Sequence, residues 1–150
     1  MLSTSSFEHG TGYEEDFALW AKEQADMLVK GNFSTLDIVN LVEEIQDMSR
    51  RHHDALEHRL TVLLAHLLKC LVPSEHKSAR WSATLFEQRK RIAKLLQKNP
   101  SLAPHVGEYA ADNYELAVKW ASADTHLPTS RFPAESPFTI VQILDPDYEP

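Results

Sequence analysis

The chain has 150 residues, of which 43% are hydrophobic and 25% charged, as is typical of one globular domain that buries a core without disulfide bonds. Its formal net charge of −7 argues against a general nucleic-acid-binding protein, because such proteins carry an excess of basic residues. Cys70 is the one cysteine, which excludes an intrachain disulfide and a multi-cysteine zinc site and favours a reducing compartment.

Residues 1–12 are small and polar, and we expect them to form a flexible terminus ahead of a single helical domain over 13–150. They lack the basic patch and apolar core of a secretory signal. The longest apolar run in the chain is far shorter than the roughly 20 residues that cross a bilayer. We therefore expect a soluble, cytoplasmic protein without a membrane segment.

Two helices are predicted in the first half of the chain. Apolar residues recur at a period of about 3.6 over residues 13–30, and Gly31 supplies a stop. The segment 34–71 has neither proline nor glycine and carries two apolar stripes, the second rich in leucine. The stripes are slightly out of phase, and Ser49 lies in the polar stretch between them, where it can cap a new helix. We therefore expect a long second helix that is kinked or broken near Ser49.

Two further main helices and a short terminal helix follow. Pro73 ends the second helix, and apolar periodicity predicts a third helix over 80–97 and a fourth over 102–123. Ser136, with a proline after it, has the form of a helix cap and opens a short helix that ends at Ile143. No stretch alternates with period two, so no sheet is predicted. The expected fold class is an all-α bundle of four main helices plus a short C-terminal helix.

Five blocks along the chain are distinctive in their order and spacing. They are YEEDFALWAKEQADML at 13–28, LDIVNLVEEIQDM at 36–48, LEHRLTVLLAHLLK at 56–69, RWSATLFEQRKRIAKLLQKNPSL at 80–102 and FPAESPFTIVQILDPDY at 132–148. Together the blocks resemble the bacterial family catalogued as domain of unknown function 29, over nearly the whole chain. The resemblance implies a small all-helical domain that stands alone. It implies no activity and no catalytic residue, because that family has no established function.

A polar cluster on the second helix is the first candidate site. His53 and Glu57 are four residues apart and share a face beside the leucine stripe, where a polar pair needs a partner. Glu44 flanks the preceding stripe, and a bend near Ser49 would bring it toward the pair. A histidine with carboxylates inside a helical bundle can bind iron, manganese or zinc, but the spacing also fits a structural His–Glu hydrogen bond or plain solvent exposure. His66 interrupts the leucine run, and we expect a core histidine bonded to a backbone carbonyl or a carboxylate there.

A basic stripe on the predicted third helix is the second candidate site. The region 75–98 holds seven lysines or arginines against two glutamates, within a chain that is acidic as a whole. Arg80, Arg91, Lys94 and Lys98 form the stripe, and Arg89, Lys90 and Lys69 lie nearby. Such a row can contact the phosphates of a nucleic acid, or it can pair with acidic helices of the same chain or of a partner. We expect the pairing role, with nucleic acid as the weaker alternative.

Motifs for covalent or nucleotide chemistry are missing from the sequence. There is no Gly-x-Ser-x-Gly elbow, and four glycines in the whole chain argue against a phosphate-binding loop. No cofactor is predicted. The leading hypothesis is therefore a non-enzymatic helical module that binds another protein or itself, for example as a homodimer. The alternatives are a metal-binding or metal-dependent bundle built on Glu44, His53 and Glu57, and a nucleic-acid accessory protein that uses the basic stripe.

Overall fold

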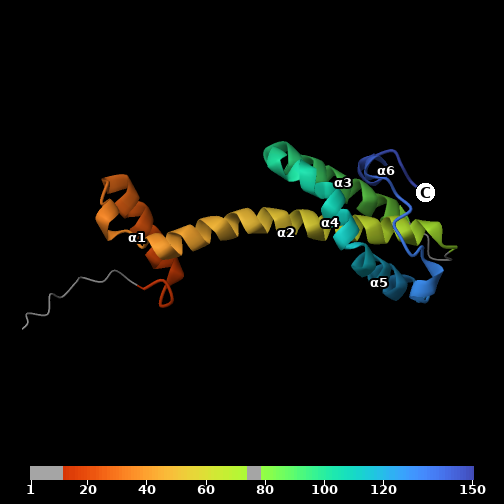
Figure 1. The fold of residues 1–150 in the computed structure, drawn as a ribbon, viewed down its shortest axis with the longest axis horizontal. Coiled ribbons are helices and arrows are strands. Elements are labelled where there is room, and N and C mark those ends of the chain that lie inside the picture. Colours follow the sequence, from red (N-terminus) through yellow and green to blue (C-terminus); the bar gives the residue numbers. More distant parts are fainter. Residues whose placement is uncertain (1–11, 74–78) are drawn as a thin grey trace, which may run out of the picture. The chain divides into compact units, whose positions relative to one another are not determined.

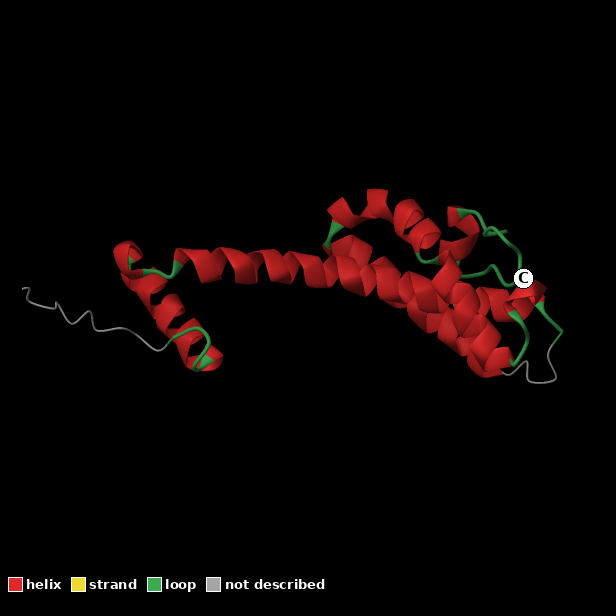
Figure 2. Ribbon diagram, turned by 60° about the horizontal axis from the view of Figure 1, so that its bottom comes forward, coloured by secondary structure: helices red, strands yellow, loops and turns green. Residues whose placement is uncertain are grey.

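The computed structural model describes residues 12–73 and 79–150, and these form helices joined by loops and short 3-10 turns, without a strand (Figure 1, Figure 2). The helices are α1 (Phe17–Lys30), α2 (Ile38–Leu71), α3 (Ala79–Lys98), α4 (Val106–Asp112), α5 (Tyr114–Thr125) and α6 (Ile140–Leu144). The prediction of an all-α fold is confirmed. The flexible terminus predicted over 1–12 lies outside the described residues, apart from Gly12.

Helix α1 begins four residues later than predicted, at Phe17, because Asp16 caps it. The Asp16 carboxylate accepts a hydrogen bond from the backbone N–H of Leu19 at 3.0 Å, which satisfies one of the free donors of the first turn. The helix ends where the sequence predicted. Gly31 has φ of 74°, in the left-handed region that favours glycine, and its N–H bonds back to a carbonyl of the last turn.

Helix α2 runs without interruption from Ile38 to Leu71, so of the kink or break predicted near Ser49 the break is wrong. Its start is held by Asp37, which accepts a hydrogen bond from the backbone N–H of Asn40 at 3.3 Å. The helix contains neither proline nor glycine, so no residue withdraws a backbone donor or favours another conformation strongly enough to end it. Although α2 is 34 residues long, neither it nor any other helix in the described residues has an apolar stretch that could span a membrane.

The chain divides into two compact units, Met1–Ser49 and Arg50–Pro150. In the first unit, Trp20 and Gln24 of α1 are buried. The Trp20 indole N–H donates to the Asp37 carboxylate at 3.1 Å, and the Gln24 side-chain oxygen accepts from the backbone N–H of Asp37 at 2.8 Å. Polar contacts centred on Asp37 therefore hold the beginning of α2 against α1.

The second unit has a core of leucines from the second half of α2. Six of them have no exposed surface, namely Leu56, Leu60, Leu63, Leu64, Leu67 and Leu68. Helix α3 contributes Leu85 and Ile92 to this core, α4 contributes Val106, and α5 contributes Ala117 and Ala121. The leucine-rich half of α2 is thus the centre of the second unit.

The predicted fourth helix over 102–123 is in fact two helices, α4 and α5, preceded by a 3-10 turn over Pro100–His105. The junction is at Asn113, whose side-chain amide donates to the Tyr109 carbonyl at 2.9 Å. The side-chain amide shares the Tyr109 carbonyl with the backbone N–H of Asn113 itself, and the regular helix is interrupted at this residue, which the apolar periodicity did not indicate.

Helix α6 begins three residues later than its predicted N-cap suggests, because a better cap lies downstream of Ser136. Thr139 and Gln142 form a reciprocal capping box, in which each side chain bonds to the backbone N–H of the other residue. The hydroxyl of Ser136 instead lies 3.4 Å from the backbone N–H of Phe138 in the preceding loop.

The C-terminal segment is tied to α3 by Arg89, a residue only 5% exposed. Its guanidinium donates to three backbone carbonyls, those of Ile143 at 2.9 Å, Tyr148 at 2.7 Å and Gln142 at 3.0 Å. We call this set of contacts the Arg89 clasp. The segment thereby folds back on the second unit, where the side chain of Ile143 enters the core.

Candidate functional site

Glu44, one of the predicted site residues, belongs to the first unit and has a partner there. The Tyr13 hydroxyl donates to its carboxylate at 2.5 Å. This hydrogen bond, with a smaller effect of burial, raises the pKa of Tyr13 to about 12, because ionising the phenol would place two negative charges side by side. Glu44 therefore anchors the segment before α1 to the first half of α2.

His53 lies in the second unit within a cluster of rings. Its Nδ1 is 2.6 Å from the Tyr109 hydroxyl. The ring of His105 stacks on Tyr109, with centroids 5.4 Å apart, and meets His53 edge-on at 5.3 Å. The sequence predicted a partner for His53 but not these two. His105 and Tyr109 are four residues apart, a spacing that places two side chains on the same face of a helix. This spacing is the feature of the sequence that could have indicated their contact.

Glu57 is half-buried on α2, one turn after His53, as predicted. Desolvation, with the negative charge of Glu57 next in size, raises the pKa of Tyr109, so the phenol keeps its proton. Across the described residues, no three His, Cys, Asp or Glu side chains are placed to share a metal ion. His53 thus packs with Tyr109 and His105, and the charge of Glu57 acts on the Tyr109 phenol.

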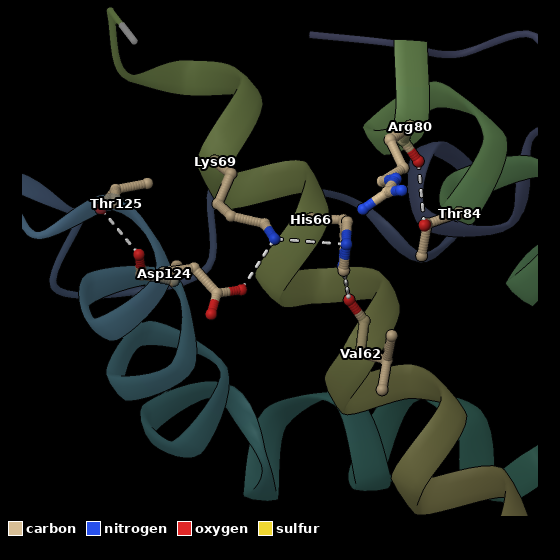
Figure 3. Close-up of polar contacts among 8 residues, drawn as sticks. Val62, His66, Lys69, Arg80, Thr84, Asp124 and Thr125 are labelled. Carbon is tan, nitrogen blue, oxygen red and sulfur yellow. Dashed lines mark hydrogen bonds and ion pairs between the residues drawn. The ribbon is translucent and has the colours of Figure 1, made fainter. Parts of the chain in front are cut away.

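His66 is the fourth predicted residue, and it forms a chain of contacts with Lys69 and Asp124 (Figure 3). Its Nδ1 lies 2.9 Å from the Val62 carbonyl, an acceptor only, so Nδ1 carries the proton. Nε2 is then free to accept from the Lys69 ammonium at 3.2 Å, and Lys69 also pairs with Asp124 at 2.8 Å. Burial lowers the pKa of His66, which favours this neutral form.

Lys69, which the sequence placed near the basic stripe, is buried instead, and a lysine within a leucine run is a sign of a buried partner. Its side chain is 4% exposed, whereas that of Asp124 is 56% exposed. The ammonium also lies 5.2 Å from the centroid of the Trp81 ring, a cation–π distance. The three neighbours satisfy a charge that would otherwise be costly to bury.

The basic stripe on α3 is exposed. Arg91 forms an ion pair with Glu87 at 2.8 Å, one turn away on the same helix. Arg80, Lys94 and Lys98 are exposed along α3 as well. Arg89, which the sequence placed near this stripe, is instead buried in the Arg89 clasp, and its surroundings differ from those of its basic neighbours.

A shallow, open cavity of about 490 Å³ lies in the second unit, beside the beginning of α5. Tyr114, Phe132 and Pro133 line it, and Glu115 is the charged side chain in its lining. Glu115 is paired with Lys119 at 2.8 Å. The carboxylate in the lining of this cavity is therefore engaged in an ion pair.

A group of exposed apolar side chains lies in the first unit. On the first half of α2, Ile38, Val42, Ile45 and Met48 follow one another at helical spacing and are 47% to 65% exposed. We call these four residues the apolar stripe. Six further large apolar side chains of the same unit are 41% to 87% exposed, namely Phe17, Leu19, Leu28, Val29, Phe33 and Val39. The sequence predicted the stripe as a helix face but not its exposure.

Comparison with known proteins adds a family and no relative of known function. The sequence family described as "domain of unknown function DUF29" matches residues 12–149. No curated protein matches the chain, and no solved structure matches it.

Proposed function

Because the chain belongs to the family described as domain of unknown function DUF29, which carries no assigned activity, we propose its function from its own surface. The protein is a non-enzymatic helical module that binds another protein, or a second copy of itself, through the apolar stripe of the first unit. A reducing compartment, the bacterial cytoplasm, suits its lone Cys70.

The observation that carries this proposal is the exposure of the apolar stripe. Large apolar side chains that stand together on a surface are typical of binding sites, since burying one of them fully is worth about 1.5–3 kcal/mol. The stripe has the spacing of a helix that packs on another helix, the commonest use of such a face. Isolated exposed side chains would need no explanation, but ten in one small unit do.

The proposal is tested by placing a photo-crosslinking amino acid at position 45, within the stripe, in the full-length chain. We expect a covalent adduct of defined mass, formed either with one other protein or with a second copy. The matched control places the same amino acid at Gln97, an exposed polar position on α3. If position 45 crosslinks no more than position 97, and the protein sediments as a monomer at every concentration, the proposal is wrong.

A further inference from the structure

Lys69 joins three helices of the second unit at one buried point. On its own helix, α2, the ammonium donates to His66 Nε2 at 3.2 Å, and it pairs with the Asp124 carboxylate of α5 at 2.8 Å (Figure 3). The third neighbour is the Trp81 ring of α3, whose centroid is 5.2 Å from Nζ. We call these four residues the Lys69 latch. Because the lysine side chain is only 4% exposed, little water can replace a partner that it loses.

The latch closes only around a neutral His66. Nδ1 of the ring holds its proton toward the Val62 carbonyl at 2.9 Å, so Nε2 carries the lone pair that accepts from Lys69. A further proton can therefore bind only at Nε2. It would place an N–H group and a positive charge 3.2 Å from the ammonium. The hydrogen bond between His66 and Lys69 cannot survive this change, because two donors of like charge would face each other.

The groups around His66 oppose its protonation. Figure 3 shows the Arg80 guanidinium of α3 directed toward the ring. From α5, Asp124 is the carboxylate whose charge favours the protonated ring, but it is already paired with Lys69. Burial, together with the charge of Lys69, lowers the pKa of His66 against the opposing effects of the Val62 carbonyl and Asp124. The neutral ring is thus favoured, and a pH below the ordinary pKa of 6.5 is needed to charge it.

We propose that the Lys69 latch is a pH-sensitive switch that holds the end of α5 on α2 and releases it in acid. When His66 is charged, Lys69 withdraws from the ring and from Trp81, and it follows Asp124 toward solvent. The opening stays local, because the leucines of α2 and Ala121 of α5 are buried through apolar contacts that do not titrate. A protonated histidine thus loosens one helix end within a folded unit.

Hydrogen exchange of the full-length protein at about pH 7.5 and about pH 5 tests the switch, after correction for the effect of pH on the intrinsic exchange rate. Acid is expected to lower the protection of residues 121–127, at the end of α5, by about tenfold, because local opening exposes these amides. Protection at residues 56–64, within the leucine core, is expected to change by less than about twofold.

Three variants assign the response to the latch. His66→Gln keeps an amide that can donate to the Val62 carbonyl and accept from Lys69 but does not titrate, so the acid response should be lost. His52→Gln, at an exposed histidine of the same helix, is the matched control and should respond as the wild type does. Lys69→Met removes the ammonium and keeps most of the apolar volume, so His66 should take up its proton at a higher pH than in the wild type. Ring NMR of His66 measures this midpoint, and circular dichroism at neutral pH confirms that each variant is folded.

Three outcomes would overturn the inference. An acid response that persists in His66→Gln would assign the response to another group. An unchanged His66 midpoint in Lys69→Met would show that the ammonium does not act on the ring. Equal loss of protection at residues 56–64 and 121–127, or no loss at either, would mean that acid unfolds the whole unit or leaves the latch closed.

Discussion

The two halves of α2 differ in what covers them, although both carry apolar residues at helical spacing. In the first half, the side chains of the apolar stripe are about half exposed, whereas in the second half six leucines are completely buried. Helices α3, α4 and α5 supply the residues that pack on the second half. In the first unit, hydrogen bonds from α1 reach the residue just before α2, through Trp20 and Gln24 to Asp37. Helical periodicity thus identifies an apolar face but does not say whether the same chain covers it.

The comparison is tested most severely by truncating one side chain in each half. We expect Leu60→Ala, at a position with no exposed surface, to lower the free energy of unfolding by about 2–5 kcal/mol, through lost burial and the cavity left behind. Ile45→Ala, in the stripe, is expected to cost less than about 0.5 kcal/mol. Urea unfolding followed by circular dichroism measures both. Similar costs for the two variants would show that the stripe is covered within the chain.

The second largest effect on stability is expected at the Arg89 clasp. The described residues of the first unit contain no similar set of contacts. Arg89→Ala leaves three backbone carbonyls, that of the buried Ile143 and those of the partly buried Gln142 and Tyr148, without their donor, and we expect a loss of about 3 kcal/mol. Lys90→Ala, at the exposed neighbouring residue, is the control and should change stability by less than about 0.5 kcal/mol. Hydrogen exchange around residues 142–148 should rise in the first variant alone. Unchanged exchange there would mean that the clasp does not hold the C-terminal segment.

In the first unit the corresponding test is Asp37→Ala, which removes the cap of α2 and the acceptor for the Trp20 indole. We expect a loss of about 1 kcal/mol and a change in Trp20 fluorescence. The pKa of Asp37 is lowered, chiefly by its hydrogen bond from Asn40. The stabilisation from Asp37 is therefore present above the ordinary pKa of 3.8 and lost as pH falls through the lower folded value. Asp37→Asn, which keeps one acceptor oxygen, should retain part of the stability and lose the pH dependence.

The smallest effect concerns His66 in the second half of α2. Because its pKa is lowered in the folded protein, chiefly by burial, the unfolded chain binds the proton more strongly. Stability is thus full above the ordinary pKa of 6.5 and decreases as pH falls from there toward the lower folded value. We expect His66→Gln to flatten this part of the stability profile. A profile that is unchanged in the variant would show that another group causes the acid sensitivity.

Much of the fold follows from the sequence because its rules are local. The all-α class, the end of α1 at Gly31 and the leucine core could be predicted from period, cap and composition. The discrepancies at Ser49 and Asn113 both concern short polar residues within helical periodicity. Both residues can cap or interrupt a helix, yet α2 continues through Ser49, whereas regular helix stops at Asn113, whose side chain bonds to the Tyr109 carbonyl.

The candidate site was harder to predict because its partners come from distant parts of the chain. The sequence indicated that His53 and His66 need hydrogen bonds, but it could not identify Tyr109, 56 residues away, or the Lys69–Asp124 pair as the groups involved. The sequence placed Arg89 beside the basic stripe, whereas the structure buries it. A shift of one position along α3 decides whether a side chain faces solvent or the core. The exposure of the apolar stripe depends on which surfaces the rest of the chain leaves uncovered. A local sequence pattern does not contain this information.

The Arg89 clasp also makes the tolerance of this region to substitution asymmetric. All three acceptors are backbone carbonyls, which every amino acid supplies. The side chains at Gln142, Ile143 and Tyr148 can therefore vary in evolution, as far as their own packing allows, without removing an acceptor from the clasp. Arg89 has no such freedom, because only a guanidinium offers donors in three directions from one planar group. Arg89 on α3 thus holds the C-terminal segment in place, whatever side chains that segment carries.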